Sequence, residues 1–175
     1  MSRKYYILAL SLLLALAIKL FPAAPQPAPT TQKSDDTLYK VTKVIDGDTI
    51  KIWRNDHEET LRLLGIDTPE TDPTYNPVEC YGKEATNETR TKLLGQNIKI
   101  ESDASQATYD KYHRLLVYVF KDGEKFNEHL IQGGFAREYT YDGAYKYQDS
   151  FKATEREARN ANRGLWSPEN CPQQH

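Results

Sequence analysis

Four carboxylates lie at two points where strands are expected to end. Asp46 and Asp48 flank a glycine after the first expected strand, and Asp67 and Glu70 follow the third. In an antiparallel meander these two points lie at the same end of the sheet. Like charges so close would raise one another's pKa, and a hard cation with oxygen ligands would relieve the repulsion. The pattern therefore predicts a Ca²⁺ site at one rim of the sheet.

Two arginines could supply the other half of such a site. Arg62 lies in the strand that leads to Asp67, and Arg114 immediately precedes the fifth expected strand. Guanidinium groups bind phosphate oxygens, while a nearby carboxylate can position or deprotonate water. Taken singly, the acids are compatible with an ordinary hairpin turn and Arg62 with a strand-edge salt bridge. Taken together, the residues indicate phosphoryl-transfer chemistry.

The elements that must position these residues follow from hydrophobic periodicity. Alternating, β-branched segments predict five strands, at 38–45, 49–54, 60–66, 97–102 and 115–120. Three segments predict helices: 81–95, a short helix 128–134 capped by Asn127, and the amphipathic 150–164, followed by Leu165-Trp166 as a core plug. This order predicts an α+β fold, a five-stranded OB-fold β-barrel with three helices.

The N-terminal segment differs from the rest of the chain. A short basic start precedes an apolar run that is shorter than the roughly 20 residues of a membrane helix. Residues 1–21 are therefore expected to be a signal peptide or, if uncleaved, a membrane tether through residues 5–21. Residues 22–36 are rich in proline and indicate a disordered linker. The domain 37–172 is expected to be exported, secreted or held at the cell envelope, as a monomer.

Two further features bear on compartment and partners. Cys80 and Cys171 show no metal-binding spacing, and in an oxidising compartment they would most simply form a disulfide; two unpaired thiols are the alternative. A disulfide over so long a loop would contribute about 4–5 kcal/mol at most. Without residues 1–36 the chain keeps 19 basic and 23 acidic side chains, a net charge of −4. Binding of a polyanion must therefore depend on local charge placement or on a cation.

Six motifs together resemble one family. These are VIDGDTIKI, LRLLGIDTPET, YGKEA, DKYHRLLVYVF, NEHLIQGGFA and RGLW. In order and spacing, residues of about 38–170 resemble the thermonuclease, or staphylococcal-nuclease-like, family. The resemblance implies an OB-fold barrel and a calcium-dependent phosphodiesterase that cleaves the 5′ P–O bond of DNA and RNA with little sequence specificity.

The resemblance also implies roles for individual residues. Asp48, Asp67 and the Thr68 carbonyl would bind Ca²⁺, with Asp46 behind them. Glu70 would orient or deprotonate the attacking water. The residues expected to bind the substrate are Arg62 and Arg114 for the phosphate, Lys111 and Tyr112 beside it, and Tyr139 or Tyr141 against the base. A hydrophobic covering of the last helix is the alternative for these last two tyrosines.

Two departures from the type enzyme and two other functions stay open at this point. The loop after Glu70, TDPTYNPVEC, has no lysine, and the two cysteines are additions. A catalytically silent OB-fold module that binds nucleic acid or protein at the cell envelope is one alternative, and a surface scaffold is another. The presence of all five core side chains favours catalysis, and they are Asp48, Arg62, Asp67, Glu70 and Arg114.

Overall fold

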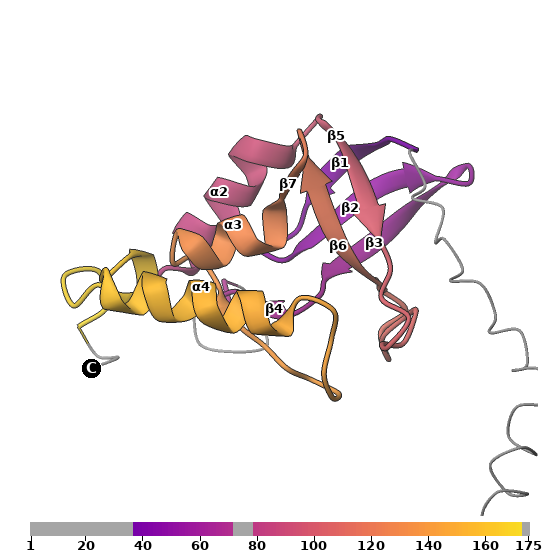
Figure 1. Cartoon of the computed structure of the whole chain (residues 1–175). Helices are drawn as coiled ribbons and strands as arrows, with labels where there is room; N and C mark the ends of the chain where they lie inside the picture. The colour runs from indigo at the N-terminus through magenta and orange to yellow at the C-terminus, as the bar shows by residue number, and fades with distance from the viewer. Residues whose placement is uncertain (1–36, 72–78, 173–175) are drawn as a thin grey trace, which may run out of the picture. The chain divides into compact units, whose positions relative to one another are not determined.

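The computed structural model describes residues 37–71 and 79–172 (Figure 1). The signal or anchor expected over 1–21 and the linker expected over 22–36 lie outside the described residues. Within the two described ranges, no helix has the length and apolar character needed to cross a membrane.

Five strands form a closed barrel, which confirms the predicted fold class. They are β1 (Tyr39–Val44), β2 (Thr49–Arg54), β3 (His57–Leu63), β5 (Asn97–Glu101) and β6 (Leu115–Lys121). The sheet has the order β3-β2-β1-β5-β6, and the short β7 (Glu124–Lys125) pairs with β6 at its edge. A parallel pairing of β3 with β6, with Leu63 opposite Val117, closes the sheet on itself.

The barrel closes around side chains from alternate strand positions. Ile50 and Ile52 of β2 are fully buried, whereas Lys51 and Trp53 between and beyond them face outward. On β3, Leu61 pairs with Ile50 and is also fully buried. Burial of each such side chain contributes about 1.5–3 kcal/mol, so the alternation in the sequence is enough to define the inner face.

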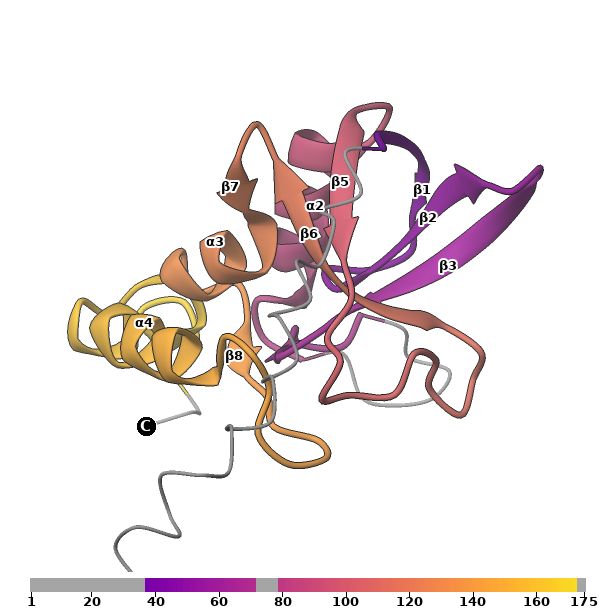
Figure 2. The ribbon, with the colours of Figure 1, turned by 45° about the vertical axis from the view of Figure 1, so that its right-hand side comes forward.

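The hairpin between β2 and β3 is tighter than the sequence suggested. A five-residue polar loop was expected at 55–59, but only Asn55 and Asp56 form the turn, and both have positive φ. This is the backbone that two-residue hairpin turns require, and Asn and Asp tolerate it best after glycine. β3 therefore begins at His57, and the hairpin extends away from the helices (Figure 2).

The expected continuous strand over 60–66 is wrong, because the chain breaks at Leu64-Gly65. β3 ends at Leu63, and a separate strand β4 (Ile66–Asp67) pairs with β8 (Arg137–Glu138). Gly65 has φ +73, and a Cβ there would lie 2.6 Å from the Tyr145 ring. A glycine is required for this turn. The break directs Asp67 away from the line of β3.

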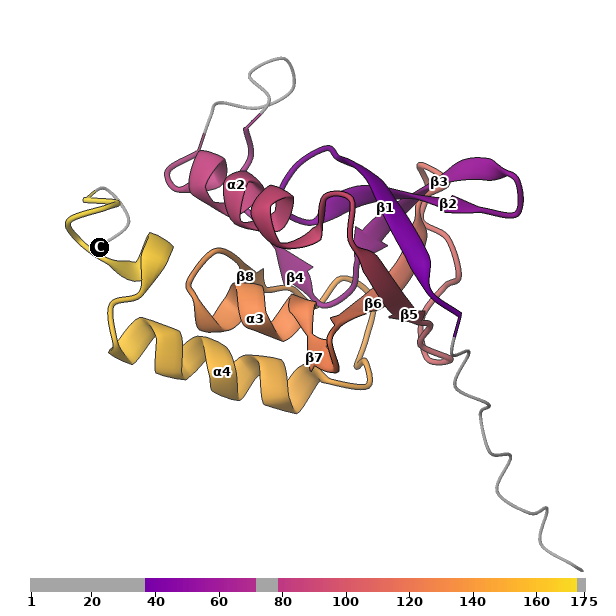
Figure 3. The ribbon, with the colours of Figure 1, turned by 90° about the horizontal axis from the view of Figure 1, so that it is seen from above.

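Three helices in the described residues lie beside one another at one side of the barrel (Figures 1 and 3). They are α2 (Gly82–Leu93), α3 (Phe126–Gln132) and α4 (Gln148–Asn160), and a 3₁₀ turn, η1 (Gly164–Trp166), follows. The predicted core plug is correct, since Leu165 and Trp166 are buried. The last helix is shorter at its C-terminal end than expected, because Gly164 belongs to η1.

Asn127 does not cap α3, as the sequence suggested, but lies inside its first turn. It is fully buried, its Oδ1 accepts the Val119 amide at 2.9 Å, and its Nδ2 donates to the Leu64 carbonyl at 2.8 Å. These bonds satisfy two backbone groups that β6 and the Leu64-Gly65 turn would otherwise bury unpaired. Asn127 thereby ties α3 to the turn that leads into β4.

Candidate active site

The turn after β1 and the exit of β4 meet through Asp48. This carboxylate is 5% exposed, and its Oδ2 accepts both the amide and the hydroxyl of Thr68, at 2.9 and 3.1 Å. Its own amide donates to Asp46 Oδ1 at 3.1 Å. Residues 20 apart in sequence are thus held in direct contact, and the carboxylates expected at one rim of the barrel lie there.

Arg62 joins the two carboxylates expected to bind the cation. Its guanidinium lies 3.2 Å from Asp48 Oδ1 and 3.1 Å from Asp67 Oδ1. Its Nη1 also donates to the carbonyls of Leu63 and Ile66, at 2.7 and 2.8 Å. Three N–H groups of the side chain donate hydrogen bonds, and its Nε forms the ion pair with Asp48; the side chain is 13% exposed. Arg62 therefore clamps the chain across the break between β3 and β4.

The carboxylates retain considerable repulsion despite Arg62. Burial, together with the negative charge of Asp48, raises the pKa of Asp46 to about 7. The same two causes raise the pKa of Asp67 to about 6. A cluster whose members disfavour one another's charge fits a hard divalent cation, since every side-chain donor is an oxygen. Among residues 37–71 and 79–172, no three His, Cys, Asp or Glu side chains are already gathered into a ligand cage.

Arg114 is held by a residue that the sequence analysis did not select. Asp110 Oδ2 accepts Arg114 Nε at 2.6 Å, and Asp110 Oδ1 accepts the Arg114 and Tyr112 amides, each at 2.9 Å. The aspartate therefore shapes the turn and orients the guanidinium. On the other side, Arg114 Nη1 lies 3.5 Å from Thr49 Oγ1, next to Asp48. An aspartate four residues before a functional arginine in a loop is the signal that could have identified this pair.

Glu70 lies at the mouth of the site and is exposed. Partial desolvation and the negative charges of Asp48 and Glu79 raise its pKa, while Arg62 and Arg114 act in the opposite direction. The Glu70 carboxyl is thus within electrostatic reach of one buried aspartate and both arginines. Of the predicted core side chains, Asp48, Arg62 and Asp67 are in direct contact.

Three tyrosines and a lysine border this rim on two loops. Tyr112 and Tyr141 are largely exposed, and Tyr139 is 43% exposed with its ring 6.2 Å from that of Tyr141. The cation of Arg114 lies 5.4 Å from the Tyr112 ring and that of Lys111 lies 5.0 Å from it. The pKa of Lys111 is raised, first by a hydrogen bond with the Tyr112 side chain and then by the charges of Tyr112 and Tyr141. Exposed rings so placed could stack on a base.

The two loops are held together by hydrogen bonds. Gln106 donates to the carbonyls of Asp142 and Ala144, and the Lys146 amide donates to Asp103 Oδ2 at 2.7 Å. Figure 2 shows both loops at the same end of the barrel, before β6 and before α4. The tyrosines of both loops are thereby placed on one side of the site.

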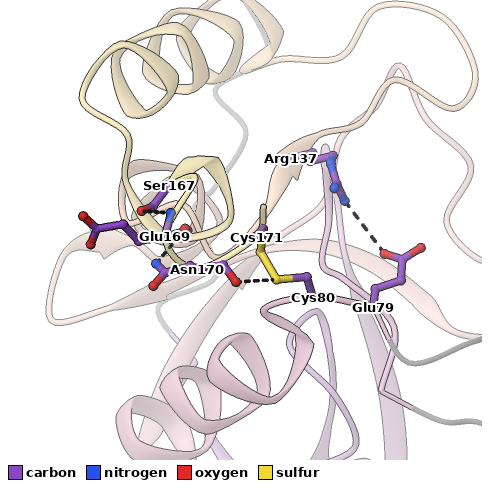
Figure 4. The surroundings of a disulfide bond; sticks show 8 residues. Glu79, Cys80, Arg137, Ser167, Glu169, Asn170 and Cys171 are labelled. Carbon is purple, nitrogen blue, oxygen red and sulfur yellow. Dashed lines mark hydrogen bonds and ion pairs between the residues drawn. A yellow bond between two sulfur atoms is a disulfide. The ribbon is translucent and has the colours of Figure 1, made fainter. Parts of the chain in front are cut away.

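The structure contains the predicted disulfide between Cys80 and Cys171, which are 91 residues apart (Figure 4). Cys171 is buried in a second, small apolar cluster with Ala158, Leu165 and Trp166. The bond joins the segment after η1 to the start of α2.

A closed OB-type barrel with two arginines and a group of carboxylates at one rim defines a nuclease-like hydrolase. Comparison with known proteins agrees. Residues 60–168 match the family described as staphylococcal nuclease homologue. The chain therefore belongs to the staphylococcal nuclease family.

Similar proteins cover nearly the whole chain. This chain is 35% identical to the thermonuclease of Staphylococcus hyicus over 162 residues. The matched region covers 92% of this chain and 95% of that protein. It is 36% identical over 160 residues to the thermonuclease of Staphylococcus intermedius, with 90% and 94% covered. Endonuclease YncB of Bacillus subtilis is 38% identical over 138 residues, which span 77% of this chain and 65% of that protein. The predicted family and the predicted class of enzyme, a nuclease hydrolase, are confirmed.

Proposed function

We propose that this protein is a calcium-dependent phosphodiesterase that hydrolyses DNA and RNA with little sequence specificity. The observation that carries the proposal is the meeting of Asp48, Asp67 and Arg62 in direct ion pairs, with Arg114 and Glu70 in electrostatic contact. A mutually repelling acid cluster around the buried Asp48, beside guanidinium groups, suits a phosphate diester and a cation.

The two arginines would share the phosphate unequally. Arg62 already donates three hydrogen bonds to protein groups and pairs its Nε with Asp48, so few of its five N–H groups are left for a substrate. Arg114 spends Nε on Asp110, and its Nη1 makes only a long contact, 3.5 Å, with Thr49 Oγ1 beside Asp48. A pair of parallel N–H groups binds two phosphate oxygens at once, so Arg114 would stabilise the charge that develops during in-line attack.

Glu70 would act on the water. Its raised pKa makes it a better proton acceptor than an ordinary surface carboxylate, and the charges of Asp48, Arg62 and Arg114 all act on it. Glu70 would orient the attacking water, or remove its proton, as the 5′ P–O bond breaks.

The Ca²⁺ would be held by Asp48, Asp67 and the carbonyl of Thr68. Asp46 would support Asp48, because its Oδ1 accepts a hydrogen bond from the Asp48 amide. When bound, the cation would neutralise charge on the phosphate.

Lys111 and Tyr112 would lie beside the phosphates, and Tyr139 or Tyr141 would stack on the base. Stacking on an aromatic ring tolerates any base, which agrees with the low sequence specificity proposed. The N-terminal segment would direct the protein out of the cell, where it would act as a monomer, secreted or tethered at the envelope through residues 5–21.

Digestion of single-stranded DNA and of RNA by the purified protein tests the proposal. Cleavage is expected with Ca²⁺ and not with a chelator. Glu70→Gln is expected to lower kcat by about 10²–10⁴-fold, the usual effect of one positioned acid or base. Glu84→Gln, an exposed glutamate in the first turn of α2, is the matched control and should retain full activity. Retained binding without any cleavage would instead identify a binding module, and near-normal turnover by Glu70→Gln would remove that residue from the mechanism.

A further inference from the structure

The backbone of Glu70 rests on the segment that carries Cys80. The Glu79 amide donates to the Glu70 carbonyl at 2.9 Å. Gly82 packs so closely that a Cβ there would lie 2.7 Å from the Pro69 carbonyl oxygen and 2.8 Å from that of Glu70. The position of the Glu70 backbone therefore depends on where residues 79–82 are held.

Residues 79–82 are restrained in two ways. One restraint is Arg137, whose Nη1 lies 3.9 Å from Glu79 Oε2, a distance typical of a weak ion pair (Figure 4).

The disulfide supplies the covalent restraint. Cys80 follows Glu79 directly and is bonded to Cys171, which is 1% exposed. The Cys171 amide donates to the Ser167 carbonyl at 2.9 Å, so the partner of Cys80 is part of a rigid turn after η1. Trp166 and Leu165 anchor that turn in the second apolar cluster. The crosslink thus connects a buried anchor to the segment beneath Glu70.

We propose that the Cys80–Cys171 disulfide is a positioning element of the active site, holding Glu70 in its catalytic location, so that nuclease turnover requires the oxidised pair. The inference rests on the proposed role of Glu70. In a thiol-rich compartment the same protein would fold as a barrel but cleave nucleic acid slowly, and formation of the disulfide would complete the site.

The chemistry of the change is a two-electron exchange. A dithiol reductant such as dithiothreitol gives two electrons and two protons to the disulfide, which becomes two cysteine thiols, and is itself oxidised to a cyclic disulfide. Reoxidation reverses the exchange without any change in the rest of the chain.

The first experiment compares turnover of the oxidised and reduced full-length protein on one single-stranded DNA. Reduction, checked by counting two free thiols, is expected to lower kcat at least about tenfold while KM changes less than about threefold, because the catalytic group and not the binding surface is displaced. Cys80→Ser with Cys171→Ser should behave like the reduced protein. Reoxidation should restore kcat in the wild type only. An unchanged kcat in fully reduced, folded protein would overturn the proposal.

A second control tests whether the disulfide affects turnover only by stabilising the whole protein. It is a variant that is destabilised at a position away from the active site. Ile98→Ala in β5 lies outside residues 67–82 and 164–172 and removes a fully buried side chain. Assayed well below the melting temperature of each protein, this variant should keep its kcat, whereas the double serine variant should not. Equal losses of kcat in both variants would show that the disulfide acts through global stability alone and would overturn the proposal.

A readout independent of activity is the hydrogen exchange of the Glu79 amide. Reduction is expected to speed this exchange at least about tenfold, while the amide of Val119, bonded to buried Asn127, keeps its protection. If oxidised protein cleaves nothing, the proposed function fails, but this measurement still decides whether the disulfide holds the Glu70 backbone. An unchanged Glu79 exchange rate in reduced protein would show that it does not.

Discussion

Asp110 holds Arg114 by its side chain and by its backbone at once. The guanidinium Nε donates to Asp110 Oδ2 at 2.6 Å, and the Arg114 amide donates to Oδ1 at 2.9 Å. Burial disfavours the charged form of Asp110, but these hydrogen bonds outweigh it and lower its pKa. The carboxylate is therefore ionised under ordinary conditions and fixes the direction in which Arg114 points.

Removal of this carboxylate should weaken catalysis without removing the arginine. Asp110→Ala removes the acceptor of the Arg114 guanidinium and of the two amides that shape the turn. Because Arg114 is then no longer oriented, kcat/KM on single-stranded DNA should fall about 10–100-fold. Asp110→Asn keeps an oxygen acceptor for the two amides and should lose less. Asp142→Asn, an exposed aspartate in the loop before α4, is the control. Full activity of Asp110→Ala would mean that Arg114 needs no orientation.

Arg62 should contribute to stability as well as to activity. It lies between Asp48 and Asp67 and satisfies two carbonyls at the break between β3 and β4. Arg62→Ala leaves a buried carboxylate without its partner, so the free energy of unfolding in urea should fall by about 3 kcal/mol. Arg90→Ala, on the exposed face of α2, should change it by less than about 0.5 kcal/mol. A loss for Arg62→Ala no larger than that of the control would contradict the role of a clamp.

Asp103 should stabilise the folded protein near neutral pH, and this contribution should be lost in acid. Burial opposes its charge, but hydrogen bonds from the Lys146 amide, Ser105 and the Tyr118 hydroxyl prevail and lower its pKa. Because the folded pKa lies below the unfolded value, the folded state binds fewer protons, and the contribution to stability is complete above the unfolded pKa of about 3.9. It is lost as the pH falls through the folded pKa.

The measurement is urea unfolding of wild type and Asp103→Asn as a function of pH. The difference in unfolding free energy should be largest near about pH 6 and should shrink as the pH falls below the unfolded pKa of about 3.9, until Asp103 is uncharged in both the folded and the unfolded state. Asp122→Asn, an exposed aspartate in the turn before β7, is the control for loss of a negative charge. A difference that stays constant with pH would show that Asp103 acts by shape and not by charge.

Much of the architecture was accessible from local patterns. Alternation of apolar residues identified the strands and their inner faces, because a side chain of a strand can point only to one of two sides. The order of the strands then predicted that Asp48 and Asp67 would meet, and in the structure both form ion pairs with Arg62. A bond between Cys80 and Cys171 was the simplest expectation for two cysteines in an oxidising compartment, with two unpaired thiols as the alternative, and the structure shows the bond.

Other features depend on groups that are distant in sequence and could not be predicted from local patterns. The break at Gly65 is set by the Tyr145 ring that packs against it, and Asn127 is a buried connector because two backbone groups need partners there. The restraint on Glu70 by Glu79 likewise joins two ends of a long loop. Residue types and their order along the chain are enough to identify the side chains that could carry the chemistry. The partners that hold those side chains become visible only in the folded protein, because hydrogen bonds and packing are satisfied in space and leave no periodic pattern along the chain.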